Sequence, residues 1–306
     1  MTERKIKIIR IVFLAGAMCL FASCRDNYHY RYFFIPSFGD KKINTHERPG
    51  FKILNEDFAL DKNRVYYREE SLESVDAKSF QIIHKNYFQD KNNVYYLDVR
   101  NSIEVNQPKA WIILIPVDLK IRLNEILSLV ILKGVDRKNI KVLESLHGSD
   151  YAHDNSFLYY KGVALEKIKK KPEFLQGSLY ELLKGSDAVY LNGRPLADSD
   201  PDSFVAGLHY AHDKHGCYYL DSEVVHFSCR PELFKVIKFG PKNEAESDYA
   251  NDDDKLFYKG HVVPGVDAAS FQIYVDEQDC YSGVCGRDKN AFFREGKRTQ
   301  APENPE

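Results

Sequence analysis

Short segments with apolar side chains on alternate positions recur along most of the chain. Residues 51–54 and 80–83 alternate with a period of two, which favours β-strands. A second short apolar segment at residues 58–60 is matched at residues 151–153, 210–212 and 249–251. A third pattern, Val-Tyr-Tyr, combines β-branched and aromatic residues that suit a pleated, half-buried surface. The pattern of apolar positions therefore predicts many short strands.

The third pattern belongs to a longer motif, Asp-Lys-Asn-x-Val-Tyr-Tyr, which begins at Asp61 and returns at Asp90. Looser copies begin at Asp154, Asp213, Asp252 and Asp288. A second marker runs in step with the motif and opens an apolar triplet, at Phe51, Phe80, Trp111, Ile140, Phe174, Phe204, Phe234 and Phe271. A period of about thirty residues, kept through about eight units, is the signature of a repeat architecture.

The motif also predicts how each unit turns. Asp bonds to its own downstream backbone, and Asn tolerates the left-handed conformation of a tight reversal. A second turn often follows the tyrosines, as at Lys161-Gly162, Asn192-Gly193 and Lys259-Gly260. Each unit is therefore interpreted as about three short antiparallel strands, which bury their apolar face only by packing on neighbouring units.

We therefore predict an all-β fold of about eight tandem hairpin or meander repeats of ~30 residues, spanning residues 51–296. An open, solenoid-like stack is the favoured arrangement, and a closed, propeller-like ring is the alternative. Three places depart from the pattern: residues 126–133 are predicted to extend a strand or form a short helix, residues 175–183 to turn helical, and the last two repeats carry insertions at residues 244–254 and 279–287. Residues 297–306 are predicted to be a disordered tail. Residues 24–50 are predicted to be a tether, or a cap on the first repeat if their aromatic residues pack.

The repeated Asp-Lys-Asn-x-Val-Tyr-Tyr units resemble the DKNYY family, a group of bacterial proteins named for this motif and without an assigned activity. The copies at Asp61 and Asp90 match the motif closely, and the others match it in part. The resemblance covers residues 51–296 and implies a protein of the bacterial cell envelope. It brings no catalytic residue with it.

The first 23 residues have the pattern of a secretory signal peptide. Arg4, Lys5, Lys7 and Arg10 precede an apolar run at residues 11–21, and small residues then precede Cys24. This ending resembles a bacterial lipobox, with Phe21 where Leu is usual, and it predicts cleavage before Cys24 and lipid on its thiol. An ordinary signal peptide with Cys24 as a bystander is the alternative. Both predict a protein outside the cytoplasm, in the periplasm or on the cell surface; the first adds a membrane anchor.

Composition and charge exclude one class of partner. The chain has 306 residues and a formal net charge of −2, and removal of the basic leader leaves a mildly acidic body. A body with charges of both signs mixed along it lacks the basic surface of a nucleic-acid-binding protein. The 43% of apolar residues, including many Tyr and Phe, is ample for a packed core.

Four cysteines remain beyond Cys19 and Cys24. An even number in an oxidising compartment suggests two disulfides, Cys280 with Cys285 and Cys217 with Cys229, although the sequence leaves all three pairings open. Cys217 occupies the position of Val65 in the first unit, so a buried free thiol is the other interpretation of that residue.

The polar clusters do not predict a metal site. His209, His212, His215 and Cys217 resemble a ligand set, but His209 and His212 point to opposite faces if they lie on one strand. Asp252, with the two aspartates that follow it, lacks the spacing of a Ca²⁺ loop. No known catalytic motif is present either. We therefore predict no metal, no cofactor and no catalytic residue.

The paired tyrosines are the candidate ligand surface. Adjacent strand residues face opposite sides, so the second tyrosine of each pair is expected to point outward: Tyr67, Tyr96, Tyr160, Tyr219 and Tyr258. A ladder of such rings suits sugars or partner proteins, but the interpretation we favour is that both rings are used in packing, one in the core and one between neighbouring repeats. We expect a lipid-anchored envelope protein that acts as a non-catalytic binding or scaffold module for a protein partner. A glycan-binding protein and an unrecognised hydrolase are the alternatives.

Overall fold

The structure is a computed structural model, and it describes residues 28–31, 35–39, 41–45, 50–105, 121–145, 150–239, 245–273 and 285–300. The chain divides into two compact units, Met1–Tyr96 and Leu97–Glu306. Among the described residues, no helix has the length and apolar composition needed to cross a membrane.

The described strands of the first unit are β1 (Tyr28–Arg31), β2 (Ile35–Phe38), β3 (Lys41–Lys42), β4 (Lys52–Ile53), β5 (Phe58–Leu60), β6 (Val65–Tyr67), β7 (Glu70–Ser71), β8 (Gln81–His84), β9 (Tyr87–Gln89) and the beginning of β10 (Val94–Val105). Those of the second unit, after the rest of β10, are β11 (Ile121–Ile131), β12 (Lys141–Val142), β13 (Tyr151–His153), β14 (Phe157–Tyr160), β15 (Val163–Lys167), β16 (Glu173–Phe174), β17 (Leu182–Lys184), β18 (Val189–Leu191), β19 (Arg194–Pro195), β20 (Val205–Ala206), β21 (Tyr210–His212), β22 (Cys217–Tyr219), β23 (Val225–Phe227), β24 (Lys235–Phe239), β25 (Ala245–Asn251), β26 (Leu256–Tyr258), β27 (His261–Val262), β28 (Gln272–Ile273), β29 (Cys285–Arg287), β30 (Phe292–Arg294) and β31 (Lys297–Thr299).

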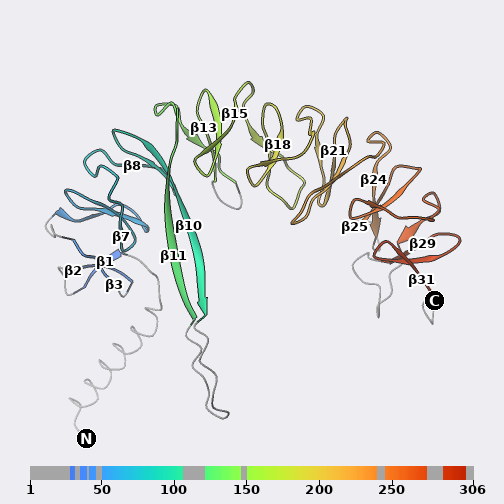
Figure 1. The fold of residues 1–306 in the computed structure, drawn as a ribbon, viewed down its shortest axis with the longest axis horizontal. Coiled ribbons are helices and arrows are strands. Elements are labelled where there is room, and N and C mark those ends of the chain that lie inside the picture. Colours follow the sequence, from blue (N-terminus) through green and yellow to red (C-terminus); the bar gives the residue numbers. More distant parts are fainter. Residues whose placement is uncertain are drawn as a thin grey trace, which may run out of the picture. The chain divides into compact units, whose positions relative to one another are not determined.

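These strands form small antiparallel meanders. Seven sheets have four strands and one has three, and neighbours within a sheet are consecutive along the chain. Figure 1 shows the sheets of the second unit following one another in chain order. The prediction of an all-β chain of tandem antiparallel repeats is confirmed.

Each full unit has four strands where about three were predicted. The additional strand is the last one, which follows the turn after the tyrosines and is often only two residues long, as in β7, β19 and β27. Its residues include Glu70, Arg194 and Pro195, which give no apolar alternation. The strand forms because the preceding turn directs the chain back along its neighbour, as in the pairing of Tyr66 with Ser71.

Several local predictions need correction. Residues 28–42, expected as a tether, contain the three-stranded sheet β1–β3, in agreement with the alternative of a cap. Residues 175–183 are not helical, and β17 begins at Leu182. The predicted tail begins with strand β31, which pairs with β30, so the repeats extend to Thr299.

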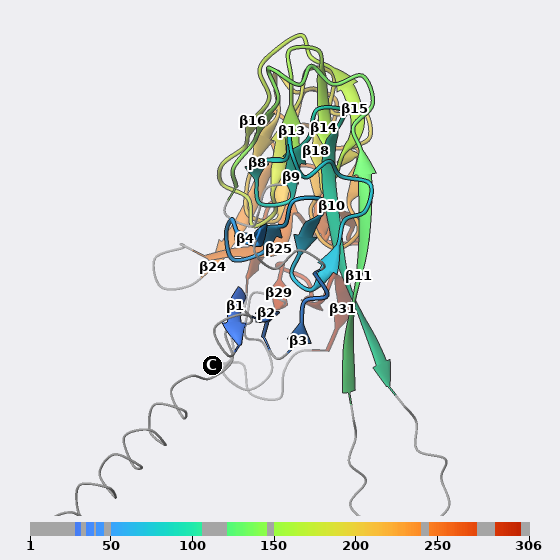
Figure 2. The same cartoon turned by 90° about the vertical axis from the view of Figure 1, so that its left-hand side faces the viewer.

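The sheet β8–β9–β10–β11 contains the longest strands. β10 has 12 residues and β11 has 11, and Figure 2 shows them side by side. Residues 126–131 therefore continue a strand and do not form a helix. The unit opening that was predicted at Trp111 lies outside the described residues.

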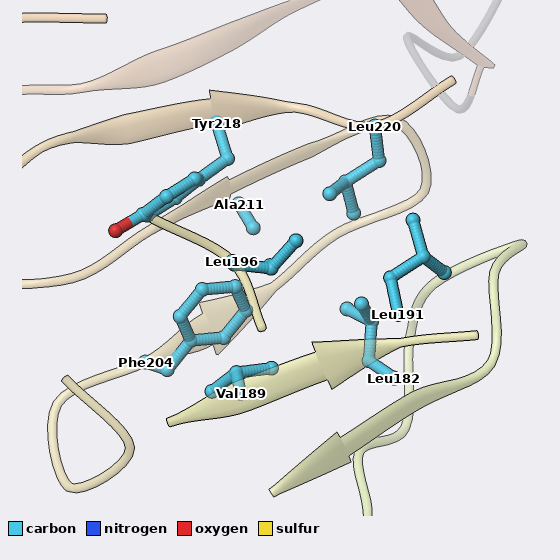
Figure 3. Close-up of a cluster of buried hydrophobic side chains, with 8 residues drawn as sticks. All are labelled: Leu182, Val189, Leu191, Leu196, Phe204, Ala211, Tyr218 and Leu220. Carbon is cyan, nitrogen blue, oxygen red and sulfur yellow. The ribbon is translucent and has the colours of Figure 1, made fainter. Parts of the chain in front are cut away.

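The core lies between consecutive sheets. One buried cluster joins Leu182, Val189 and Leu191 of the β16–β19 sheet to Phe204, Ala211 and other residues of the β20–β23 sheet (Figure 3). A second cluster joins Tyr151 and Leu158 to the β16–β19 sheet in the same way. A four-stranded unit of this size exposes one apolar face when alone, so the packing of neighbours supplies the stability that the repeat pattern predicted.

Candidate functional site

The aspartate that opens each motif is buried at Asp61, Asp90, Asp154, Asp213, Asp252 and Asp288, and we call these six residues the motif aspartates. At Asp90, Oδ1 accepts hydrogen bonds from the N–H groups of Asn92 and Asn93, at 2.7 and 2.8 Å. Its Oδ2 accepts hydrogen bonds from the Tyr95 hydroxyl at 3.0 Å and from the N–H of Asp76 at 2.9 Å. One carboxylate thus fixes a turn, a strand and the loop that enters the unit.

The turn bonds recur at all the other motif aspartates. Burial alone would raise the pKa of Asp90, but the N–H groups of Asp76, Asn93 and Asn92 and the Tyr95 hydroxyl outweigh burial and hold that pKa below its usual value. The same balance lowers the pKa of Asp154 and of Asp288. These carboxylates are structural anions, engaged on both oxygens.

The motif lysine also has a structural partner. Lys91, Lys214 and Lys289 form ion pairs with aspartates in the loop that enters the same unit, at 3.1, 2.6 and 2.7 Å. In each pair the lysine side chain is about 60% exposed, as for an ordinary surface ion pair of small energetic value. The polar residues of the motif are therefore used mainly to close and connect the units.

One unit builds the same junction with different residues. Gly185 occupies the position of the motif aspartate, and Glu166 of the preceding sheet takes over its role. The Glu166 carboxylate accepts the Tyr190 hydroxyl at 2.9 Å and the N–H groups of Ser186 and Asp187. A Cβ atom at position 185 would lie 2.5 Å from Glu166 Oε1, so glycine makes room for the substitute carboxylate.

The second tyrosines do not form the exposed ladder that the sequence suggested. Tyr67, Tyr96 and Tyr219 are buried, with 2–5% of their surface exposed. Each packs on an aromatic ring of the neighbouring strand, as in the 4.9 Å contact between the rings of Tyr87 and Tyr96. Because they are buried, these rings are not available as a ligand surface. Alternation along one strand gives the direction of a side chain, but not whether rings of the neighbouring strands and sheets cover it.

Tyr160 and Tyr258 are only partly buried, although they make the same cross-strand contacts, at 4.7 Å with Tyr151 and 4.8 Å with Tyr249. The Tyr151 hydroxyl accepts the N–H of Gly193, in the hairpin turn of the next sheet, at 2.7 Å. Of the five candidate tyrosines, Tyr160 borders a pocket.

Two pockets share Leu179, Tyr180 and Glu181, in the loop between β16 and β17. The first, which we call the Tyr160 pocket, has a volume of 370 Å³ and is lined by Asp150, Tyr160, Leu179, Tyr180, Glu181, Leu191 and Asn192. The second, which we call the Phe174 pocket, has a volume of 460 Å³ and is lined by Glu144, Ser145 and residues 174–182. Both have the size of small-molecule or side-chain sites.

The pockets lie at a unit that lacks the aromatic cross-strand pair. Leu182 pairs with Leu191 where the sheet before it pairs Tyr151 with Tyr160. Two leucines fill less space than two rings, and Tyr180 of the adjoining loop packs against the Leu182–Leu191 cluster. The smaller side chains leave room at this edge of the unit.

The pocket lining is acidic. Glu144, Asp150 and Glu181 line the two pockets, and among the described lining residues there is no Lys, Arg or His. Burial, and then the negative charges of Asp150 and Glu181, raise the pKa of Tyr160 to about 12. The Tyr160 pocket therefore combines aromatic surface with two carboxylates, of which Asp150 is paired with Lys161.

The cysteine and metal predictions can be placed in part. Cys217 and Cys229 form a disulfide with a Cα–Cα distance of 5.9 Å, one of the two outcomes left open for this pair. Cys285 is also disulfide-bonded, whereas Cys280 and Cys24 lie outside the described residues. Within the described ranges, no group of three or more His, Cys, Asp or Glu side chains is placed to hold a metal ion.

Sequence reasoning missed Glu166, Tyr180, Glu181 and Asn192. The available signal was the absence of the motif from one unit, with Gly185 in place of Asp and Leu191 in place of the second tyrosine.

Comparison with protein families matches the DKNYY family over residues 4–99 and 131–297. No curated protein and no solved structure matches the chain.

Proposed function

We propose that this chain, which belongs to the DKNYY family, is a non-catalytic binding or scaffold module, anchored at the cell envelope by lipid on Cys24. The main support is that the motif residues have structural roles, whereas the pocket residues Tyr180 and Glu181 do not belong to the motif. The motif aspartates, lysines and tyrosines are engaged in turns, ion pairs and packing. The acidic, aromatic pockets around Tyr180 and Glu181 are where the repeat pattern is broken, and they are the proposed binding surface.

The proposed location is supported by two features. The leader has a basic start, an apolar run and small residues ahead of Cys24. The disulfide between Cys217 and Cys229 suits an oxidising compartment outside the cytoplasm. A module held at the membrane by lipid would present its repeats to envelope partners.

The anchor is tested by cell fractionation of Cys24→Ser, with Cys19→Ser as the matched control. We expect Cys24→Ser to leave the membrane fraction and Cys19→Ser to remain in it. Retention of Cys24→Ser in membranes as an uncleaved chain would show that the lipoprotein assignment is wrong.

Glycan binding is the second candidate, and the Tyr160 pocket favours it. The rings of Tyr160 and Tyr180 offer apolar faces to a sugar, and Asp150 and Asn192 offer hydrogen-bonding groups to its hydroxyls. Binding of isolated cell-wall polysaccharide, lost in Tyr180→Ala, would support this candidate over a protein partner.

A hydrolase is the third candidate, because Asp150 and Glu181 line one pocket. Asp150 lies 3.5 Å from Lys161 Nζ and is already engaged in that ion pair. This contact makes binding the better-supported role for the pocket.

A further inference from the structure

Three units contain the same arrangement of an acid, a cation and a ring. The cation follows the second tyrosine in the hairpin turn, and the acid precedes the paired strand. Arg68 Nε lies 3.1 Å from Asp57 Oδ1, and its Cζ lies 5.2 Å from the centroid of the Tyr67 ring. We call this arrangement the acid–cation–ring triad.

The triad recurs with similar distances in two repeats of the second compact unit, Leu97–Glu306. Lys161 lies 3.5 Å from Asp150 and 5.6 Å from the Tyr160 ring centroid. Lys259 lies 3.5 Å from Asp248 and 5.7 Å from the Tyr258 ring centroid. These distances are those of a cation held jointly by a carboxylate and an aromatic face. The edge of the repeat is thus suited to an ammonium or guanidinium group.

The β16–β19 sheet keeps the acid of this arrangement and lacks both its cation and its own ring, which Leu191 replaces. The rings of Tyr160, from the preceding sheet, and Tyr180 line the pocket beside this acid. Glu181 precedes Leu182, and Asn192 follows Leu191, in the register that the triads use. Asn192 has a φ of 49°, the value found at Lys161 and Lys259, so the turn itself is unchanged. A neutral amide occupies the place of the lysine.

Glu181 therefore has no built-in counter-charge. It accepts a hydrogen bond from the Ser145 hydroxyl, and within the described part of the chain no Lys or Arg forms an ion pair with it. Asp150, the other carboxylate of the Tyr160 pocket, is already paired with Lys161. Glu181 is thus the carboxylate left to a ligand.

We propose that the Tyr160 pocket receives an organic cation, an ammonium or guanidinium group that Glu181 binds in the place left by the missing turn cation. The favoured source is a Lys or Arg side chain of a protein partner. Leu179, which lines the pocket with 57% of its surface exposed, would contact the apolar part of such a partner. This inference rests on the proposed binding function and names its ligand chemistry.

The test is calorimetric titration of the full-length protein in detergent with two probes that differ only in charge, N-acetyl-argininamide and N-acetyl-citrullinamide. We expect the arginine probe to bind at least about tenfold more tightly, a ratio that corresponds to about 1.4 kcal/mol. The difference should shrink as the ionic strength rises. Equal affinities, or no binding of either probe, would overturn the proposal.

Three variants locate the site. Glu181→Gln should weaken binding of the arginine probe by about tenfold or more, because it removes the charge from the acceptor. Asn192→Lys should do the same, because it restores the built-in cation seen at Lys161 and Lys259. Glu173→Gln is the matched control: it removes an exposed carboxylate of the same sheet outside both pocket linings, and should leave binding unchanged. An effect of Glu173→Gln as large as that of Glu181→Gln would contradict a local site.

A second arm identifies the source of the cation. Glucosamine carries an ammonium group, which acetylation removes in N-acetylglucosamine. If glucosamine binds in a Glu181-dependent way and N-acetylglucosamine and the arginine probe do not, the cation belongs to a sugar and the peptide source is overturned. A partner crosslinked in cells that is retained by Glu181→Gln, together with failure of all cationic probes, would overturn the cation inference and leave the proposed binding function intact.

Discussion

The carboxylate of Glu166 accepts a hydrogen bond from the hydroxyl of Tyr190 at 2.9 Å, across the junction between two consecutive sheets. In the other units this bond, where it exists, is made by a motif aspartate five residues before the tyrosine. Glu166 lies 24 residues before Tyr190, so the same junction is closed by a residue of the neighbouring repeat.

Removal of this substitute carboxylate should destabilise the protein. Glu166→Ala leaves the Tyr190 hydroxyl and the N–H of Ser186 without their acceptor, and an unsatisfied buried donor costs about 1–3 kcal/mol. Chemical denaturation should show a loss of unfolding free energy in this range. The control Glu173→Ala changes an exposed side chain and should stay within about 0.5 kcal/mol of the native protein. Equal effects of the two variants would contradict the role of Glu166.

A double mutant tests whether position 185 and Glu166 exchange roles. Gly185→Asp alone should be destabilising, because its Cβ would lie 2.5 Å from Glu166 Oε1. Combined with Glu166→Ala, it restores a motif aspartate, so the loss should be smaller than the sum of the two single losses. Strict additivity in the free energy of unfolding would show that the two positions are independent.

Loss of the motif aspartate should lower the free energy of unfolding more than loss of the tyrosine hydroxyl that donates a hydrogen bond to it. Asp90→Ala leaves three N–H groups without an acceptor and removes one of the two acceptors of the Tyr95 hydroxyl, and should cost at least about 3 kcal/mol. Tyr95→Phe removes the hydroxyl that contacts Asp90, the Ser74 carbonyl and the Asn93 side chain, but leaves the three N–H groups their acceptor, and should cost about 1–2 kcal/mol. Tyr95→Ala empties a fully buried site and should cost about 3–5 kcal/mol. A lower unfolding midpoint for Tyr95→Phe than for Asp90→Ala would contradict the assigned roles.

Acid should unfold the protein through the same carboxylates. Hydrogen bonds hold the pKa values of Asp61, Asp90 and Asp154 below their ordinary range in the folded state despite burial. A lowered folded-state pKa contributes stability that is complete above the unfolded pKa of about 3.9 and is lost as the pH falls toward the folded value. Denaturation midpoints should therefore be level near neutral pH and fall below about pH 4. In Asp90→Asn this fall should be shallower.

Reduction of the disulfide should also weaken the fold. Cys217 and Cys229 are 12 residues apart, and closing a loop of this size stabilises a protein by about 3 kcal/mol in the chain-entropy view. The pair Cys217→Val with Cys229→Ser supplies the valine found at this position in the first two motifs, so the core stays filled. A loss of about 2–4 kcal/mol is expected, and reductant should have less effect on the variant than on the native protein.

The period, the strand content and the aspartate turns were predictable because they follow from local chemistry repeated at fixed spacing. The turn at Asp90 needs only the carboxylate and the N–H groups two and three residues later. The sequence favoured packing for both tyrosines of a pair, but it could not identify the ring that Tyr96 packs against, because Tyr87 lies on the neighbouring strand.

The candidate site was harder to predict for the same physical reason. Glu181 becomes notable only when Asn192 is recognised as the turn residue that faces it, and that relation comes from the pairing of Leu182 with Leu191. Glu166 acts on a different repeat from its own. The repeat motif describes the residues of one repeat, so it does not predict contacts between two repeats.

The motif residues build the fold, and we propose that the pocket at Leu179 and Glu181 binds the partner. The most direct measurement is in-cell crosslinking from a photoreactive residue at position 179, with the equally exposed position 163 as control. We expect a defined adduct from position 179 that disappears in Glu181→Gln, while that variant keeps the native unfolding midpoint. An adduct formed equally from position 163, or unaffected by Glu181→Gln, would contradict it.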